Sequence, residues 1–228
     1  MKKKLLIFVA LIVSVLSLSA CGKTKINIAD YVIEERNQLF TGQDSLYSAT
    51  LSSGLREENY SLDGIVGNMI DFAVVTFMRL DSNPLANDTY RYNVTINEQN
   101  YTGTLEKSPY DNSYAIDLGV AVPADASVNV QITFTGYAFN QDLENTSVNF
   151  AVDKTTALNI ANQTLEEEIK NITSDKNNKI EVVMKILKDY SNSELKTYYW
   201  YVGIIATNGE TLGVLIDANT GNIIAKKV

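Results

Sequence analysis

The sequence contains no histidine and a single cysteine, Cys21. Histidine is the most common general base and a frequent zinc ligand, so its absence excludes Ser-His-Asp and Cys-His arrangements and most zinc sites. A lone cysteine forms no disulfide within the chain. A glycosidase needs only two placed carboxylates, but the order of residues points to no such pair. We therefore expect a protein that is not an enzyme and has no cofactor and no metal.

Basic residues are also scarce, with 19 Lys and Arg against 27 Asp and Glu. Three of the lysines lie in the first twenty residues, which carry no acid. The chain from Cys21 onward therefore has 16 basic and 27 acidic side chains, a net charge of −11. A surface of this sign repels nucleic acid and anionic lipid headgroups, so we expect neither as a binding partner.

Residues 1–20 have the organisation of an export signal. A lysine-rich start precedes an apolar run over residues 5–16, which is too short to span a bilayer core roughly 30 Å thick. The string Leu18-Ser19-Ala20-Cys21 resembles the bacterial lipobox, in which the cysteine sulfur is acylated and the signal is cut before it. The resemblance implies that lipid on Cys21, including acyl groups such as palmitate, holds the protein on the extracytoplasmic face of the cell membrane.

The rest of the chain divides into three parts. Residues 21–30 are expected to be a lipid-anchored tether. Residues 31–150 contain short alternating apolar runs separated by turn clusters, which predicts an all-β, sandwich-like domain. Its expected strands lie at residues 47–55, 72–78, 89–96, 101–105, 114–120 and 128–134. The segment 54–67 is ambiguous and stays unassigned.

The pattern changes at Val152. Asp153 is a candidate N-cap, and apolar residues then recur at helical spacing as far as Ile172. Three strands are expected after the helix, at residues 179–190, 197–206 and 211–217. Residues 151–228 are thus predicted to form a helix plus a three-stranded antiparallel sheet. The predicted fold class is α+β overall, with the all-β domain first.

The Asn-Gly pair at residues 208–209 predicts a two-residue type I′ turn, in which both residues take positive φ. The register that follows places four apolar side chains of the hairpin on one face. They are Trp200, Val202, Ile204 and Leu215. One face of the sheet is expected to take the helix, and the other needs a second cover. These four residues are the candidate partner surface, with plain packing against the sandwich-like domain as the alternative.

Three motifs of this segment point to a known family. They are Asp-Lys-Thr-Thr-Ala-Leu at residues 153–158, Tyr-Trp-Tyr-Val-Gly-Ile at 199–204 and Ile-Asp-Ala-Asn-Thr-Gly-Asn-Ile at 216–223. With them, residues 150–228 resemble a PepSY domain, which occurs in propeptides of secreted metallopeptidases and in many exported bacterial proteins. The resemblance implies inhibition or chaperoning of a peptidase and supplies no catalytic residues. Because the sequence shows no peptidase domain of its own, the expected partner is a secreted peptidase in trans.

Two acidic segments have both a structural and a metal-binding interpretation. The segment from Asp217 to Gly221 lacks the late bidentate glutamate of a calcium loop, which favours a turn in which Asp217 bonds local backbone. Glu166, Glu167 and Glu168 favour a solvated helix face over a metal site.

Three hypotheses about function follow. The first is a surface-anchored, non-enzymatic binding lipoprotein that modulates a secreted peptidase in trans. The second is an envelope structural or assembly lipoprotein with no peptidase partner. The third and most remote is a hydrolase that uses carboxylates alone. The feature that separates the first two is the free face of the C-terminal sheet: an exposed apolar patch implies a partner.

The lipid anchor is testable by the variant Cys21→Ser. Without the thiol there is no acceptor for the lipid, so the protein should be released from the membrane or left unprocessed. Fractionation of cells followed by immunoblotting measures both outcomes. Recovery of the variant in the membrane fraction at the mature size would contradict the prediction.

Overall fold

The computed structural model describes residues 26–81, 83–109, 111–175, 177–188 and 197–228, and the predicted anchor at Cys21 lies outside them. None of the helices in these ranges is long and apolar enough to span a membrane. The helices are the 3-10 helices η1 (Ile28–Tyr31) and η2 (Thr146–Asn149) and the α-helices α2 (Lys154–Thr164) and α3 (Glu166–Ile172). The strands are β1 (Val32–Gln43), β2 (Tyr47–Glu57), β3 (Met69–Arg79), β4 (Arg91–Ile96), β5 (Gln99–Thr104), β6 (Glu106–Lys107), β7 (Tyr114–Leu118), β8 (Val128–Phe134), β9 (Tyr137–Asn145), β10 (Ile180–Lys188), β11 (Tyr198–Ala206), β12 (Thr211–Asp217) and β13 (Ile223–Lys227).

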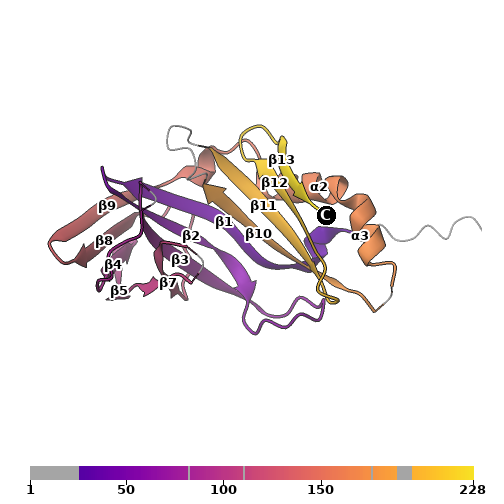
Figure 1. Cartoon of the computed structure of the whole chain (residues 1–228), viewed down its shortest axis with the longest axis horizontal. Helices are drawn as coiled ribbons and strands as arrows, with labels where there is room; N and C mark the ends of the chain where they lie inside the picture. Colours follow the sequence, from indigo (N-terminus) through magenta and orange to yellow (C-terminus); the bar gives the residue numbers. More distant parts are fainter. Residues whose placement is uncertain (1–25, 82, 110, 176, 189–196) are drawn as a thin grey trace, which may run out of the picture.

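The strands of the described residues join into one 13-stranded sheet (Figure 1). Its main path runs β13-β12-β11-β10-β1-β2-β3-β7-β6. The remaining strands, in the order β5-β4-β8-β9, return to β1 because β9 pairs with β1 at Phe40 and Thr41. The sheet therefore curls back on itself and nearly closes. Nearly all of its strand pairs are antiparallel, and β1 with β10 is a parallel pair.

This architecture shows that the predicted α+β fold class is wrong. Strands make up 52% and helices 14% of the described residues, and no separate C-terminal unit of one helix and three strands is present among them. The physical reason is the parallel pairing of β1 with β10, which runs from Val32 opposite Val182 to Arg36 opposite Lys185. The strands predicted for a second sheet thus extend the first one. A fourth strand, β13, adds to their far edge.

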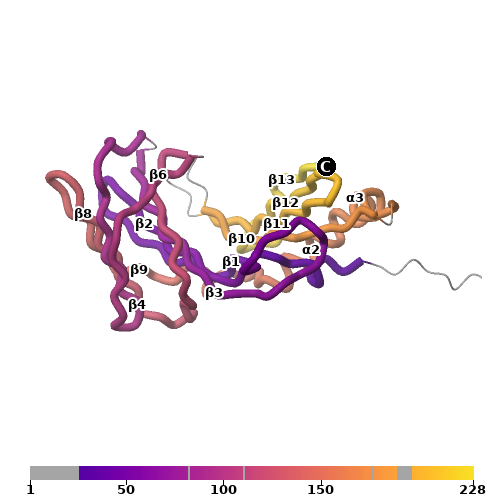
Figure 2. The backbone as a smooth tube through the Cα atoms, turned by 90° about the horizontal axis from the view of Figure 1, so that it is seen from below, coloured from indigo at the N-terminus to yellow at the C-terminus, as the bar shows by residue number. Residues whose placement is uncertain are grey.

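One half of the curled sheet encloses the first core (Figure 2). As the alternation predicts, Val128, Val130 and Ile132 of β8 point inward and are buried. Aromatic rings fill the centre of this core. Phe77 packs against Tyr90 and Phe139, with ring centroids 5.9 and 5.3 Å apart. Such contacts contribute to stability beyond the area they bury.

Helices α2 and α3 cover one face of β10, β11 and β12 and close the second core. The predicted cap is confirmed, because the Asp153 carboxylate accepts the N–H of Thr156 at 2.7 Å. The predicted apolar stripe is buried, but Leu165 divides it between two helices. Across the core, the Trp200 indole donates to the carbonyl of Val152 at 2.8 Å. This bond fixes the tryptophan under the start of α2.

The turn between β11 and β12 differs from the predicted type I′ turn. The Ala206 N–H donates to the Glu210 carbonyl and closes a three-residue loop, and of the Asn-Gly pair only Gly209 takes a positive φ, 89°. The additional loop residue moves the register by one, so that Tyr201 lies opposite Leu215. Since successive strand residues face opposite ways, a slip of one residue exchanges the faces. The predicted grouping of four apolar side chains on one face is therefore wrong.

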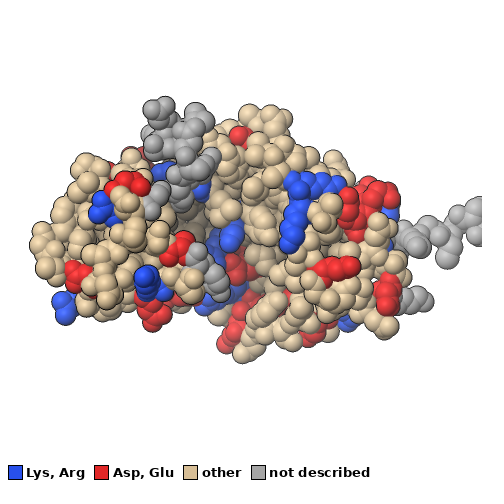
Figure 3. Space-filling view, viewed as in Figure 1, with Lys and Arg blue, Asp and Glu red and all other residues tan. Residues whose placement is uncertain are grey.

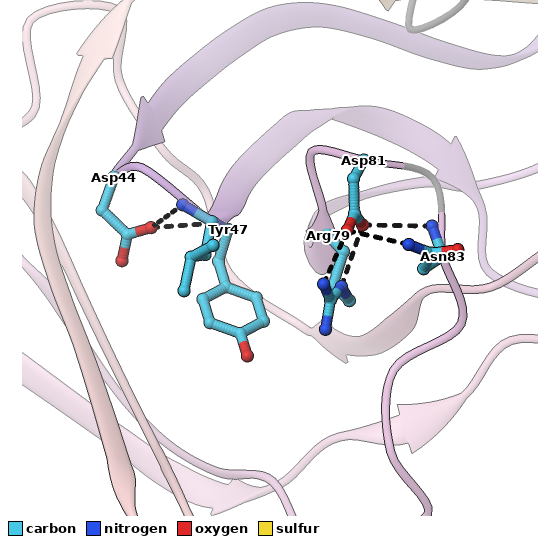
Figure 4. Close-up of polar contacts among 6 residues, drawn as sticks. Asp44, Tyr47, Arg79, Asp81 and Asn83 are labelled. Atoms are coloured by element: carbon cyan, nitrogen blue, oxygen red, sulfur yellow. Dashed lines mark hydrogen bonds and ion pairs between the residues drawn. The ribbon is translucent and has the colours of Figure 1, made fainter.

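Two carboxylates shape loops of the N-terminal half (Figure 4). Asp44 follows β1, and its side chain accepts the N–H of Tyr47 at 2.8 Å. Asp81 follows β3 and accepts two bonds from Arg79, at 2.9 and 2.6 Å, and further bonds from Asn83. These donors, Arg79 first, hold the pKa of the Asp81 carboxyl well below its usual range. Both carboxylates satisfy local backbone and side-chain donors, which is a structural role.

The protein is expected to lose stability at alkaline pH because Tyr90 is buried in the first core. Its side chain is buried and its hydroxyl donates to the Ala86 carbonyl at 2.9 Å, and burial raises the pKa of Tyr90 from 10 to about 12. The native state therefore gains stability below pH 10 that is lost as the pH rises from about 10 to 12. Tyr90→Phe should flatten the fall in unfolding free energy over this window, measured by urea denaturation at a series of pH values. Equal slopes for the two proteins would contradict this expectation.

Candidate functional site

The strands β10, β11 and β12 have a second face that the helices do not cover. We call it the outer face; it consists of Val183, Lys185, Leu187, Tyr199, Tyr201, Gly203, Ile205, Gly213 and Leu215. The side chains other than the two glycines are half-buried rather than fully enclosed. Figure 3 shows that the molecular surface is hollowed between the two halves of the molecule, and that cationic and acidic side chains gather there. An apolar sheet face with charges at its margin is the most prominent candidate site in the described residues.

The ring of Tyr201 lies across a pair of glycines on the outer face. Gly203 and Gly213 are opposite one another on β11 and β12. A Cβ at Gly203 would lie 2.5 Å from the Tyr201 hydroxyl oxygen, and a Cβ at Gly213 would lie 3.4 Å from the ring. The two glycines thus create the space in which the ring rests against the sheet. Leu215, opposite Tyr201, extends this surface.

Lys185 lies on the other side of Tyr201. The two residues are paired across β10 and β11, and the Lys185 Nζ is 5.7 Å from the centre of the Tyr201 ring. Burial, and next the nearby charge of Arg36, lower the pKa of Lys185, while Glu34 opposes this shift. Among the residues that the structure describes, Lys185 has no ion pair.

Cations and aromatic rings continue from Lys185 onto the neighbouring strands. Arg36 of β1 is the register partner of Lys185, and its Nε binds the Glu34 carboxylate at 2.8 Å. The guanidinium groups of Arg36 and Arg56 lie 5.3 and 4.6 Å from the centre of the Phe72 ring. Arg56 also pairs with Asp117. We call Lys185, Arg36 and Arg56 the cationic strip.

The loop between β2 and β3 borders the start of β10. Glu181, which is fully buried, accepts the N–H groups of Asp63 and Gly64 at 2.8 and 2.9 Å and so holds this loop. Burial, and then the charges of Glu181 and Glu57, raise the pKa of Tyr60 on the same loop. Residues 54–67, left unassigned above, therefore divide into the end of β2 and this anchored loop.

The structure does not bring the predicted partner surface together. Trp200, Val202 and Ile204 are 3%, 0% and 0% exposed and lie in the core under the helices. Leu215 is half-buried on the outer face. As the sequence predicts, one face of the sheet is left uncovered by the helices. That face is formed by Tyr201 and its neighbours, not by the predicted residues. The predicted lipidation site, Cys21, lies outside the described residues.

The two acidic segments have the structural roles that the sequence favours. Asp217 accepts the N–H groups of Asn219 and Thr220 at 2.9 and 2.8 Å. Gly221 follows with a φ of 75°, which completes the turn. The three glutamates of α3 form ion pairs on the surface. The pairs are Glu166 with Lys170, Glu167 with Lys170, and Glu168 with Lys226. Within the described ranges, no group of three or more Asp, Glu, His or Cys residues is arranged to hold a metal ion.

No protein-family model, curated protein or solved structure matches this chain. The resemblances to the lipobox and to PepSY domains therefore stay predictions.

The glycine platform is testable by Gly203→Ala. The added Cβ would displace the Tyr201 ring, and overpacking of this kind costs about 1–3 kcal/mol of unfolding free energy. Gly119→Ala is the matched control, because a Cβ there meets no atom within 4 Å. Urea denaturation of both variants measures the difference. Equal stability of the two variants would show that the ring does not rest on the glycines.

Proposed function

We propose that this chain is a lipid-anchored, extracytoplasmic binding protein, not an enzyme, and that it binds a protein partner through its outer face. The observation that supports this most directly is the Tyr201 ring spread over Gly203 and Gly213 beside Leu215, on a face that no helix covers. Tyrosine and arginine are enriched among the residues that dominate protein interfaces. A half-buried aromatic surface with cations at its margin has this composition.

The chemistry of the described residues favours binding over catalysis. The sequence has no histidine, and its one cysteine is the proposed lipid acceptor. The most buried carboxylates have structural partners: Glu181 and Glu57 accept loop N–H groups, and Glu35 pairs with Lys154 at 2.8 Å. These bonds give each of the three carboxylates a structural role.

The location and the class of partner rest on the sequence. The lysine-rich start, the short apolar run and the lipobox-like string support anchoring through Cys21 outside the cell membrane. The resemblance of residues 150–228 to PepSY domains supports a secreted peptidase, modulated in trans, as the candidate partner. The net charge of −11 disfavours nucleic acid.

A second candidate is an envelope structural or assembly lipoprotein without a peptidase partner. The burial of Trp200 and Val202 favours it, since this burial removes the partner surface that the sequence predicts. The two candidates differ in whether the outer face makes a specific contact with another protein.

Leu215→Glu tests the proposed surface. A carboxylate on the outer face should weaken capture of a secreted peptidase by the full chain about tenfold or more, because it must be desolvated next to apolar side chains. Leu46→Glu is the matched control, because Leu46 is 46% exposed in the turn between β1 and β2 and is not part of the outer face. Pull-down from the envelope fraction, quantified for peptidases, is the measurement.

Equal capture by both variants would contradict the assignment of the surface. Capture of no peptidase by any form, including the unmodified chain, would remove the peptidase as the partner and leave the structural candidate.

A further inference from the structure

Lys185, at the β10 end of the cationic strip, is half-buried and has no ion pair among the described residues. Its register partner on β1 is another cation, Arg36. The acid that favours the charge of Lys185, Glu34, is bound to Arg36. Lys185 and Arg36 thus have one carboxylate between them, which leaves one positive charge in excess among these three residues.

Lys185 and Arg36 both have hydrogen-bond donors to spare. An arginine has five N–H donors, and the one hydrogen bond of Arg36 in the described structure uses Nε, toward Glu34. Its two Nη groups and the ammonium of Lys185 have no acceptor among these residues. Because the two residues are register partners on adjacent strands, their side chains leave the same face of the sheet and present these donors to the same side of the molecule.

We propose that Lys185 and Arg36 form a binding site for a carboxylate of the partner polypeptide, either an Asp or Glu side chain or a chain terminus. This inference rests on the proposed function and names the chemistry of the partner at the outer face. The Tyr201 ring and Leu215 lie on the far side of Lys185 and contact the apolar part of the bound segment. The carboxylate balances the one positive charge that is in excess among the described residues Lys185, Arg36 and Glu34.

The acidic residues beside the cationic strip favour a ligand group with a single negative charge over a more highly charged one. Glu34 and Asp117 flank the strip, bound to Arg36 and Arg56. A phosphate, a nucleic acid backbone or an anionic membrane would bring more negative charge toward these acids and toward a chain of net charge −11. A carboxylate carries one charge and matches the fork of the guanidinium group.

Titration calorimetry with the full chain in a nonionic detergent tests this site. Two terminally blocked peptides are compared, one with a central Asp-Asp pair and one with Asn-Asn in its place. The other two probes are the Asn-Asn peptide with a free C-terminal carboxylate and inorganic phosphate. The blocked Asp-Asp peptide should bind about tenfold more tightly than its Asn-Asn form if the site takes a side-chain carboxylate. The free-terminus peptide should gain instead if the site takes a chain end.

Lys185→Met should reduce the affinity for the preferred peptide about tenfold, to the level of the blocked Asn-Asn peptide. It should leave the thermal midpoint unchanged or higher, because burial and Arg36 disfavour the lysine charge. Lys107→Met is the control, since it removes an exposed lysine on β6 and should not change the affinity.

Three results would overturn the inference: equal affinity for the acidic and neutral peptides, tightest binding of phosphate, or an equal loss in Lys107→Met. The proposed function is judged separately. If Leu215→Glu abolishes capture of the partner while the peptides do not differ, the outer face is the interface and the carboxylate site is wrong. If neither effect is found, both are wrong.

Discussion

The parallel pairing of β1 with β10 is the contact on which the rest of the structure depends. β1 also pairs with β2 and β9, so this one strand joins the curled N-terminal half to the C-terminal strands. The buried Glu35 of β1 pairs with Lys154 of α2 at 2.8 Å and ties the helices to the same strand. The pairing also brings Arg36 beside Lys185, although the two residues lie 149 positions apart in the chain.

The helices decide which face of the C-terminal strands is available. They cover the face of Trp200, whose indole is fixed by the Val152 carbonyl, and leave the face of Tyr201 uncovered. The covered face is fully apolar and contributes to stability. The outer face instead carries the Tyr201 ring over two glycines and Lys185, which has no ion pair among the described residues. Proteins often retain such features where function requires them.

Local features of the fold could be predicted from the sequence, whereas their assembly could not. The cap at Asp153, the apolar stripe of the helices and the alternation of β8 follow from residues close in the chain. The sequence does not predict β1, because its segment from Glu34 to Gln38 is polar and a central strand is expected to be apolar. In the structure, the charges of this segment pair with one another and with α2. Without β1, the C-terminal strands appear as a separate sheet. The sequence does not predict the candidate site, partly because it does not predict β1. In addition, the three-residue turn at Gly209 places the side chains of β12 on the opposite face from the one that a two-residue Asn-Gly turn would give.

The central claim is that β1 and β10 together build one binding site, in which Arg36 and Lys185 contact the same carboxylate. A double-mutant cycle with Arg36→Met and Lys185→Met, measured on the affinity for the preferred acidic peptide, tests this most directly. If both cations bind one group, the double variant should lose clearly less affinity than the sum of the single losses. Strictly additive losses would show that the two residues act independently and would contradict the account.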